Sequence, residues 1–391
     1  MKILYLRNTR QYHLDVIEVL KKRGHHLMIE RIADEDREVL KGFTLNRENK
    51  LLQKIQTADW DILFSLDYYP CISMLCETIK KRYVSWCLKP PFSNLYSSSV
   101  LNSGNLIFTA DKWLAESFRK EGISNISYLS EGVNIDRCNQ IREELKEEKD
   151  TLECFMPGDI REPSWQELFQ TEYLLDATLG YLEGLTASQA LIYGYDFWQN
   201  RLPEYLYHDL LNNSKLRPGH DSIQDIPQYY AEQCFYPKTT AVDRNFALKV
   251  LSKVCRVNIC SKETAPEQIN ITNHGELPLA KKQELIWKSR VNFQIAPRGF
   301  KDGVYGQALQ IMGMGGFLIT DYRRALEEEF VPGKDFIIFE DMKHLAESVG
   351  YYLEHSKERE EIALSAYEKI KKNYNLEQRI EKIEKKVELY E

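Results

Sequence analysis

Short apolar runs alternate with helical segments along the first 135 residues. The runs cover residues 2–6, 26–30, 61–65, 83–86, 106–109 and 126–129. One intervening segment, Asp15 to Arg23, has apolar residues at helical spacing and ends at Gly24, which favours a helix C-cap. Strands separated by helices predict a parallel sheet with helices on both faces, and the loops after its strands form the ligand-binding edge.

A second series of the same kind occupies the C-terminal part of the chain. Apolar runs at 234–237, 257–260, 291–295, 316–320 and 335–339 alternate with helical segments, and a helical tail follows from 342 to 390. Residues 164–230 lack strand alternation and carry aromatic and acidic residues at helical spacing, which predicts a helical insertion. A charge-rich stretch at 140–151 indicates a domain boundary.

Together these patterns predict an α/β protein with two Rossmann-like domains facing a cleft. We expect the first domain at 1–150, the helical insertion at 151–232, the second domain at 233–365, and a C-terminal helix at 366–391 that returns to the first domain. The length of 391 residues agrees with two domains, because single hydrophobic cores rarely grow beyond about 250–300 residues.

Composition narrows the classes of protein. The net charge of -7 disfavours nucleic acid as a partner. The eight cysteines are scattered without the spacing of a zinc knuckle or redox pair, so we interpret them as reduced, buried thiols and expect no metal site. The N-terminal apolar run is too short for a signal peptide, and no stretch approaches the roughly 18 apolar residues of a membrane span. We expect a cytoplasmic protein without a transmembrane segment.

The segment from Asn292 to Phe317 contains the densest set of residues that could bind a ligand or take part in a reaction. A predicted strand ends near Ile295, a glycine-containing loop follows, and a helix begins near Val304. Free backbone N–H groups and the positive dipole end at a helix start can hold a phosphate, and Arg298 could pair with it. The alternative interpretation is that these glycines serve ordinary turns and helix–sheet packing.

The run from residue 303 to 322, GVYGQALQIMGMGGFLITDY, resembles the C-terminal segment of the CgeB-like (spore maturation protein) glycosyltransferases of the GT-B group. Further similarity lies at 83–86, 105–108, 235–237, 273–275 and 328–335. The resemblance implies a GT-B fold and a glycosyl transfer from a nucleoside diphosphate sugar, bound by the second domain, to an unidentified glycan, peptide or small molecule. It implies no cofactor and no catalytic metal, and leaves the oligomeric state open.

The resemblance also implies residue roles in donor binding. The candidate donor-binding residues are Tyr236, Lys238, Arg244, His274, Arg298, Gly303, Gln307, Gln310, Gly315 and Gly316. Two positions depart from the family, because its members usually carry arginine at Gln307 and an acidic residue at Gln310. A glutamine amide can hydrogen-bond a ribose diol, but without the charge assistance of a carboxylate.

The first domain should supply the acceptor site and any general base. Asn8, Arg10, Tyr68 and Lys89 are the candidate acceptor-binding residues, and Lys89 replaces an aspartate that is common in the family. The candidate bases, which must reach the acceptor hydroxyl, are Asp67, Asp111 and His13. Each of these residues could instead be an ordinary loop or capping residue.

Two alternative functions differ in how well they agree with the sequence. A catalytically silent GT-B relative, which binds a nucleotide-sugar or glycan or partners an active transferase, is favoured by Gln307 and Gln310. An NAD-dependent oxidoreductase is disfavoured, because the first strand is followed by Arg7-Asn8-Thr9-Arg10 and not by a Gly-x-Gly-x-x-Gly loop.

Overall fold

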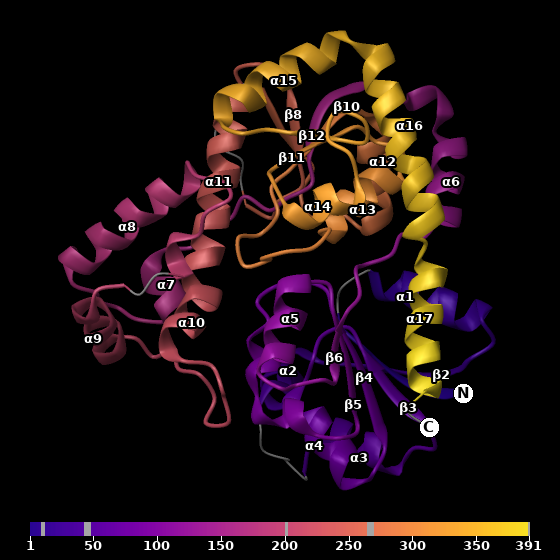
Figure 1. Ribbon diagram of the computed structural model, residues 1–391, viewed down its shortest axis with the longest axis vertical. Helices are drawn as coiled ribbons and strands as arrows, with labels where there is room; N and C mark the ends of the chain where they lie inside the picture. Colours follow the sequence, from indigo (N-terminus) through magenta and orange to yellow (C-terminus); the bar gives the residue numbers. More distant parts are fainter. Residues whose placement is uncertain (9–11, 43–47, 200–201, 264–269, 390–391) are drawn as a thin grey trace.

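The computed structural model contains two α/β domains, one above the other in Figure 1, with a helical insertion beside them. It describes residues 1–8, 12–42, 48–199, 202–263 and 270–389. Each domain is built on a six-stranded parallel sheet. The predicted α/β fold class with two Rossmann-like domains is therefore confirmed.

The sheet of the first domain has the strand order β2-β1-β3-β4-β5-β6. Its strands are β1 (Lys2–Arg7), β2 (His26–Arg31), β3 (Ile62–Ser65), β4 (Arg82–Cys87), β5 (Asn105–Thr109) and β6 (Ile126–Tyr128). The helices around it are α1 (Tyr12–Lys22), α2 (Asp34–Lys41), α3 (Lys50–Thr57), α4 (Pro70–Thr78) and α5 (Lys112–Lys120), with 3₁₀ turns at Ser93–Tyr96 and Ser98–Leu101. The strand order reverses beside β1, and the carboxyl ends of β1 and β3 at such a switch point border a natural ligand crevice.

The sheet of the second domain has the order β12-β11-β10-β7-β8-β9. Its strands are β7 (Leu152–Met156), β8 (Val257–Ile259), β9 (Ile271–Asn273), β10 (Ser289–Gln294), β11 (Leu318–Thr320) and β12 (Ile337–Ile338). Its helices are α6 (Ile135–Glu144), α11 (Tyr236–Leu251), α12 (Leu279–Lys288), α13 (Gly306–Gly313), α14 (Arg324–Glu329), α15 (Met342–Glu354) and α16 (Ser356–Asn373), with a 3₁₀ turn at Lys146–Glu148. The sequence pattern did not predict the central strand β7, because its short apolar run directly follows a charged segment.

The chain enters the second domain at α6. The apolar face of α6, including Ile135, Cys138 and Ile141, packs in the core beneath α13 together with Leu309 and Met312. The first sheet has already ended at β6, so the crossing from one domain to the other lies between β6 and α6. This crossing precedes the charge-rich stretch at which the sequence analysis placed the boundary.

A helical insertion separates β7 from α11. It contains α7 (Trp165–Phe169), α8 (Asp176–Ala190), a 3₁₀ turn (Phe197–Gln199), α9 (Glu204–Asn213) and α10 (Ile226–Tyr230). Buried aromatic and leucine side chains give it a small core of its own. The run 234–237, which we predicted as a strand, instead belongs to a π-helical turn (Ala231–Phe235) and to the start of α11, so one helical rod leads from the insertion into the second domain.

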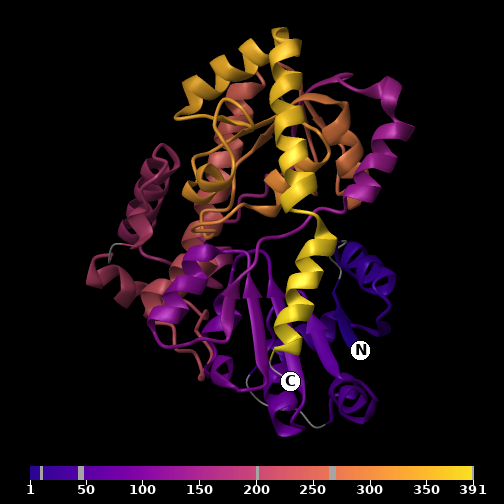
Figure 2. The same cartoon turned by 45° about the vertical axis from the view of Figure 1, so that its right-hand side comes forward.

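The C-terminal helix α17 (Leu376–Glu388) returns to the first domain, as Figure 2 shows. Leu376, Ile380 and Ile383 recur at helical spacing and are buried in the core of the first domain. The carboxylate of Glu384 accepts hydrogen bonds from the guanidinium of Arg23, at 2.6 to 2.9 Å. This helix therefore ties the two domains together at a second point.

The described residues also bear on the expectations about cysteines and membrane spans. All eight cysteines are buried and none of them forms a disulfide, which agrees with the expectation of buried thiols. None of the described helices combines the length and the apolar character that crossing a bilayer requires.

Candidate functional site

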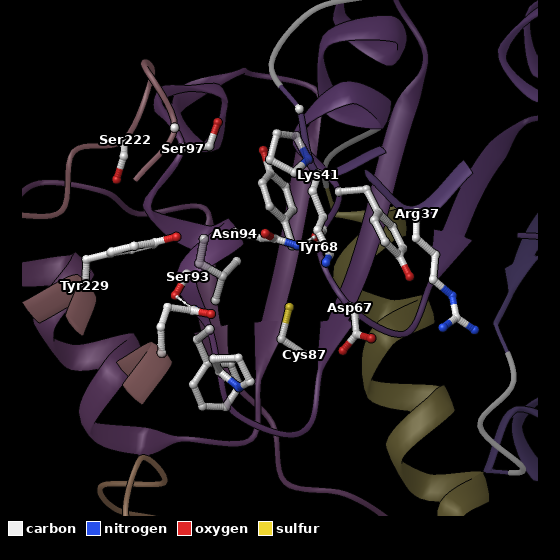
Figure 3. A pocket seen from close by; sticks show the side chains of 18 of the residues that line it. Arg37, Lys41, Asp67, Tyr68, Cys87, Ser93, Asn94, Ser97, Ser222 and Tyr229 are labelled. Atoms are coloured by element: carbon white, nitrogen blue, oxygen red, sulfur yellow. Dashed lines mark hydrogen bonds between the residues drawn. The ribbon is translucent and has the colours of Figure 1, made fainter. Parts of the chain in front are cut away.

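A cavity of about 730 Å³ lies at the carboxyl edge of the first sheet. Among the candidate residues, Asn8, Asp67, Tyr68 and Lys89 line it. In Figure 3, Asp67 and Cys87 approach it from the sheet, Arg37 and Lys41 from α2, and Tyr229 from the opposite side. We name this the acceptor cavity. Its size lies within the ~300–1,000 Å³ typical of small-molecule sites.

The helical insertion closes one side of the acceptor cavity. The backbone N–H of Ser98 donates to the carbonyl of Asp221 at 2.8 Å, and that of Ile223 donates to the carbonyl of Tyr96 at 2.7 Å. The amide of Gln228 donates to the hydroxyl of Tyr96 at 2.6 Å. A segment inserted in the second domain thus completes a cavity of the first, which the sequence could not indicate.

Asp67 follows β3 and has an unusual backbone conformation, with φ of 106°. Its carbonyl accepts hydrogen bonds from the hydroxyls of Ser65, at 2.6 Å, and Tyr83, at 3.3 Å. A positive φ is strained in a residue with a side chain, and such strain is concentrated at functional sites. Its carboxylate, which lines the acceptor cavity, accepts a 3.4 Å hydrogen bond from the amide of Asn8. Asp67 therefore remains a candidate base.

His13 does not reach the cavity. Its side chain is fully buried, with Nδ1 at 2.8 Å from the hydroxyl of Tyr5 and Nε2 at 2.8 Å from Oδ1 of Asn8. Both ring nitrogens are therefore engaged by protein groups. The predicted catalytic role of His13 is replaced by a supporting one, in which it orients the Asn8 side chain that contacts Asp67. The candidate Arg10 lies outside the described residues, and the Tyr68 ring is buried with its hydroxyl 2.8 Å from that of Ser99.

Asp111 is also unsuited to act on an acceptor. Its carboxylate caps α5 by accepting from the N–H of Leu114 at 3.1 Å, and it accepts from the N–H groups of Lys301 at 2.6 Å and Asp302 at 3.3 Å. Burial raises the pKa of Asp111 to about 6. The position that we predicted as a possible base is thus a contact that joins the first domain to the glycine loop of the second.

A second cavity, of about 270 Å³, lies between the domains near the carboxyl edge of the second sheet. Tyr236 and Arg244, both candidate donor residues on α11, line it together with Pro90 and Pro91 of the first domain. The Arg244 guanidinium donates a 3.0 Å hydrogen bond to the carbonyl of Ile295, at the end of β10. We name this the cleft cavity. Because Pro91 also lines the acceptor cavity, the two cavities are neighbours.

Glu232 lines the cleft cavity and was not identified from the sequence. It lies in the π-helical turn, a distortion often found at functional sites. Its carboxylate accepts a 3.0 Å hydrogen bond from the N–H of Phe92, and burial raises the pKa of Glu232 to about 7. The sequence carried no signal for this, because an acidic residue in a polar helical segment is normally solvated.

The raised pKa of Glu232 predicts a dependence of stability on pH. The folded state holds a proton that the unfolded chain releases above the ordinary pKa of 4.5, so this contribution to stability is present at low pH and is lost as pH rises to about 7. We expect Glu232→Gln to flatten the decline in the free energy of unfolding between pH 4.5 and 7, as measured by denaturant titrations. Parallel profiles for the two proteins would contradict the shifted pKa.

The predicted phosphate site at the start of α13 is occupied by a protein carboxylate. A Cβ atom on Gly306 would lie 2.0 Å from Oε2 of Glu131, a residue of the segment that connects the domains. Gln310 is buried, accepts a 3.0 Å hydrogen bond from Gln283 and lies 3.5 Å from Oε1 of Glu131. A carboxylate is stabilised at a helix N-terminus for the same reason as a phosphate. The Glu131 carboxylate therefore lies beside the helix start at which the sequence predicted the donor diphosphate.

Gly303 lies in the same buried loop, in contact with the first domain. A Cβ atom there would approach the carbonyl oxygen of Ala110 to 2.4 Å. The predicted glycine loop is therefore closed against Ala110 and Asp111, and its glycine permits close contact between domains in place of contact with an anion.

Three predicted donor residues hold protein groups in place. Arg298 forms a buried ion pair with Asp243 at 2.6 Å and donates to the carbonyl of Ile192 at 3.0 Å, which attaches the insertion to α11. The buried Lys238 binds Glu162 at 2.9 Å. The amide of Gln307 donates to the carbonyl of Pro157. Protein carboxylates and carbonyls therefore already pair with these two cations and this amide. The sequence could not show this, because the partners are distant along the chain.

The other predicted donor residues lie apart from the cleft cavity. His274 follows the edge strand β9, with Nε2 at 2.9 Å from Oδ1 of Asn258, and burial lowers its pKa. Gly315 and Gly316 precede β11 and are therefore at the amino edge of the sheet, where they line a separate cavity beside Trp287. The carboxyl ends of the strands lie at the opposite edge, so we correct these two glycines from donor binding to a turn between α13 and β11.

Lys301, for which the sequence predicted no role, joins three parts of the structure. Its ammonium group binds the carboxylate of Asp196 and the hydroxyl of Tyr236, and lies 3.5 Å from the centre of the Tyr236 ring. Burial lowers the pKa of Lys301. The glycine loop, the insertion and α11 therefore meet at one buried cation beside the cleft cavity.

Part of the chain is similar to a known protein family. Residues 241–385 match the model of a family described as glycosyl transferase-like. A search of curated proteins gave no match. The match begins within α11, includes the glycine loop and α13, and continues into α17, so the similarity to this family covers the C-terminal part of the chain.

Several solved structures share the fold along the whole chain. A glycosyltransferase from Rickettsia africae has 14% identity and a TM-score of 0.51, covering 100% of this chain and 97% of its own. HepE from Anabaena, in complex with UDP-glucose, has 10% identity and a TM-score of 0.58 with 99% of both chains covered. Sucrose-phosphate synthase from Thermosynechococcus elongatus has 8% identity and a TM-score of 0.53, with 100% of both covered. At these identities the similarity establishes the fold, which is that of the GT-B glycosyltransferases.

Proposed function

We propose that this chain, whose second domain matches the glycosyl transferase-like family, transfers a sugar from a nucleoside diphosphate donor in the cleft cavity to an acceptor in the acceptor cavity. The observation that carries the proposal is the pair of neighbouring cavities at facing carboxyl edges of two parallel sheets. Open α/β sheets bind ligands at these edges. The narrower similarity to CgeB-like enzymes, a cytoplasmic location and the absence of a catalytic metal stay parts of this proposal.

Arg244 is the residue that we assign to the donor diphosphate. It lines the cleft cavity, and none of the described carboxylates lies within ion-pair distance of it. Charge-assisted hydrogen bonds from a guanidinium stabilise the negative charge that develops on a leaving diphosphate. Because HepE is seen with UDP-glucose and with UDP, UDP-glucose is the first donor to test and UDP is the first nucleotide product to test for binding.

Removal of the Arg244 charge should weaken donor binding. We expect Arg244→Gln to raise the dissociation constant of UDP by roughly 10- to 100-fold, the range for a hydrogen bond to a charged group. Titration calorimetry would measure this, with Lys253→Gln as the matched control, because this turn lysine of the same domain does not line the cleft cavity. Equal affinities of the two variants would remove Arg244 from the donor site.

Asp67 is the residue that we assign as general base. It accepts the proton of the acceptor hydroxyl while that oxygen bonds to C1 of the donor sugar and the bond from C1 to the diphosphate oxygen breaks. Of the three predicted bases, His13 and Asp111 are buried and occupied by protein partners, whereas Asp67 is partly exposed to the acceptor cavity. Glu232 is less suitable because it lines the cleft cavity and not the acceptor cavity.

A second candidate function is a catalytically silent GT-B relative that binds a nucleotide-sugar or glycan. The position of Glu131 at the start of α13 and the burial of Gln310 favour it, because both oppose a donor phosphate or ribose at that helix. Release of free nucleotide on addition of acceptor distinguishes the candidates, since binding alone leaves the donor intact. If neither UDP-sugars nor other common nucleotide-sugars raise the melting temperature, the transferase proposal fails.

A further inference from the structure

Positive charge is concentrated around the acceptor cavity although the whole chain carries a net charge of -7. Arg37 and Lys41 from α2, Lys89 from the loop after β4, and Arg217 from the insertion line it. Of the described lining residues, Asp67 and Asp221 are acidic. A cavity lined mainly by one sign of charge focuses the local field and attracts ligands of the opposite sign.

Two of these cations have no carboxylate partner among the described residues. The Lys89 side chain is exposed, and the contact found for its ammonium group is the Tyr305 ring, 6.0 Å away. The Arg217 guanidinium donates to the carbonyls of Ser214 and Leu216, each at 2.8 Å, and to that of Leu211. These carbonyls hold the guanidinium in place but do not neutralise its charge.

Among the described residues of the lining, the carboxylates of Asp67 and Asp221 offset only part of the charge of the four cations. The Asp221 carboxylate accepts a hydrogen bond from the hydroxyl of Ser97, and no described cation lies within ion-pair distance of it. Arg37 forms a 3.0 Å pair with Asp34, which is largely exposed. Exposed pairs of this kind contribute about 0–1 kcal/mol, so a ligand anion can compete for Arg37.

The rest of the lining suits a carbohydrate. Hydroxyl and amide groups from Ser93, Asn94 and Ser222 and the ring of Tyr229 also line the cavity, on the side away from Arg37 in Figure 3. Hydroxyls and amides can both donate to and accept from sugar hydroxyls, and an aromatic face packs against a sugar ring. A cavity with these groups and surplus cations is therefore suited to a ligand that is both polyhydroxylated and negatively charged.

We propose that the acceptor is an anionic carbohydrate, a sugar or polyol that carries a phosphate or a carboxylate. Lys89 and Arg217 bind its anionic group, and a hydroxyl is presented to Asp67. This inference rests on the proposed glycosyl transfer, because it identifies the substrate of the acceptor cavity. It goes beyond that function by excluding neutral glycans as the preferred acceptors.

Binding measurements without donor test this inference separately from catalysis. The probes for calorimetry are glucose 6-phosphate, glucuronate, glucose and inorganic phosphate, with the full chain and with the variants Lys89→Gln and Arg217→Gln. We expect one of the anionic sugars to bind at least ~10-fold more tightly than glucose and inorganic phosphate, and each variant to lose most of this difference. Phosphate or carboxylate is identified as the anionic group by which of the two sugars binds.

The controls distinguish a loss of ligand binding from a disturbed loop and from failure of the proposed function. Lys253→Gln, a lysine outside the cavity lining, should bind the anionic sugar as the unmodified protein does. Lys89→Gln breaks no described hydrogen bond, so its result stands even if Arg217→Gln disturbs the loop. Glucose binding as tightly as both anionic sugars, phosphate binding as tightly as them, or unchanged affinity in Lys89→Gln overturns the inference. Absence of UDP binding would instead count against the proposed function.

Discussion

Replacement of Asp67 by asparagine should lower the rate of sugar transfer by roughly 10²- to 10⁴-fold, the range for the loss of a general base. The amide keeps the shape of the side chain but cannot accept the proton of the acceptor hydroxyl. The backbone should tolerate the change, because asparagine is among the residues most often found at positive φ. The measurement is the initial rate of nucleotide release from UDP-sugar in the presence of acceptor, with UDP affinity determined in parallel.

The expected signature is loss of rate with unchanged UDP binding, since Asp67 lines the acceptor cavity and not the cleft cavity. Asp59→Asn is the matched control, because Asp59 is 82% exposed in a surface pair with Lys2 of the same domain. Full activity in Asp67→Asn would exclude this carboxylate as the base and would direct attention to Glu232.

Replacement of Gly303 by alanine should destabilise the closed arrangement of the two domains. The new Cβ would lie 2.4 Å from the carbonyl oxygen of Ala110 and 2.9 Å from the Phe300 ring, and φ at Gly303 is 150°. A clash with backbone cannot be relieved by a side-chain rotation, so backbone strain and overpacking add. We expect a fall in the melting temperature of roughly 5 °C or more.

Gly180→Ala is the control, because we expect it to raise the stability that Gly303→Ala lowers. Gly180 lies inside α8, and a Cβ atom there meets nothing within 4 Å. Alanine at such a position should raise stability by about 0.5–1 kcal/mol, because glycine loses more backbone entropy on folding. A melting temperature for Gly303→Ala equal to that of the unmodified protein would show that the loop opens easily, and that the contact with Ala110 contributes little to stability.

Local sequence patterns were sufficient for much of the fold. Runs such as 2–6 and 106–109 became buried parallel strands, and the segment 164–230 became the helical insertion. These elements follow from side-chain periodicity, which each segment carries by itself. Strand β7 was missed because Glu153 interrupts its apolar run. The pattern at Cys234 predicted a strand where the structure has a helical rod, because short apolar runs fit either structure.

The candidate site likewise has features that the sequence predicted and features that only the tertiary structure determined. That Asp67, Asn8 and Lys89 follow strands, and so gather at one edge of a sheet, was readable from the sequence. Which charges are neutralised was not, because ion pairs such as Arg298 with Asp243 join residues far apart along the chain. Only the tertiary structure placed Glu131 at the start of α13 and Glu232 beside the cleft, and left Lys89 and Arg217 without carboxylates among the described residues. Periodicity is a local property, whereas burial and electrostatic pairing depend on which distant segments come together.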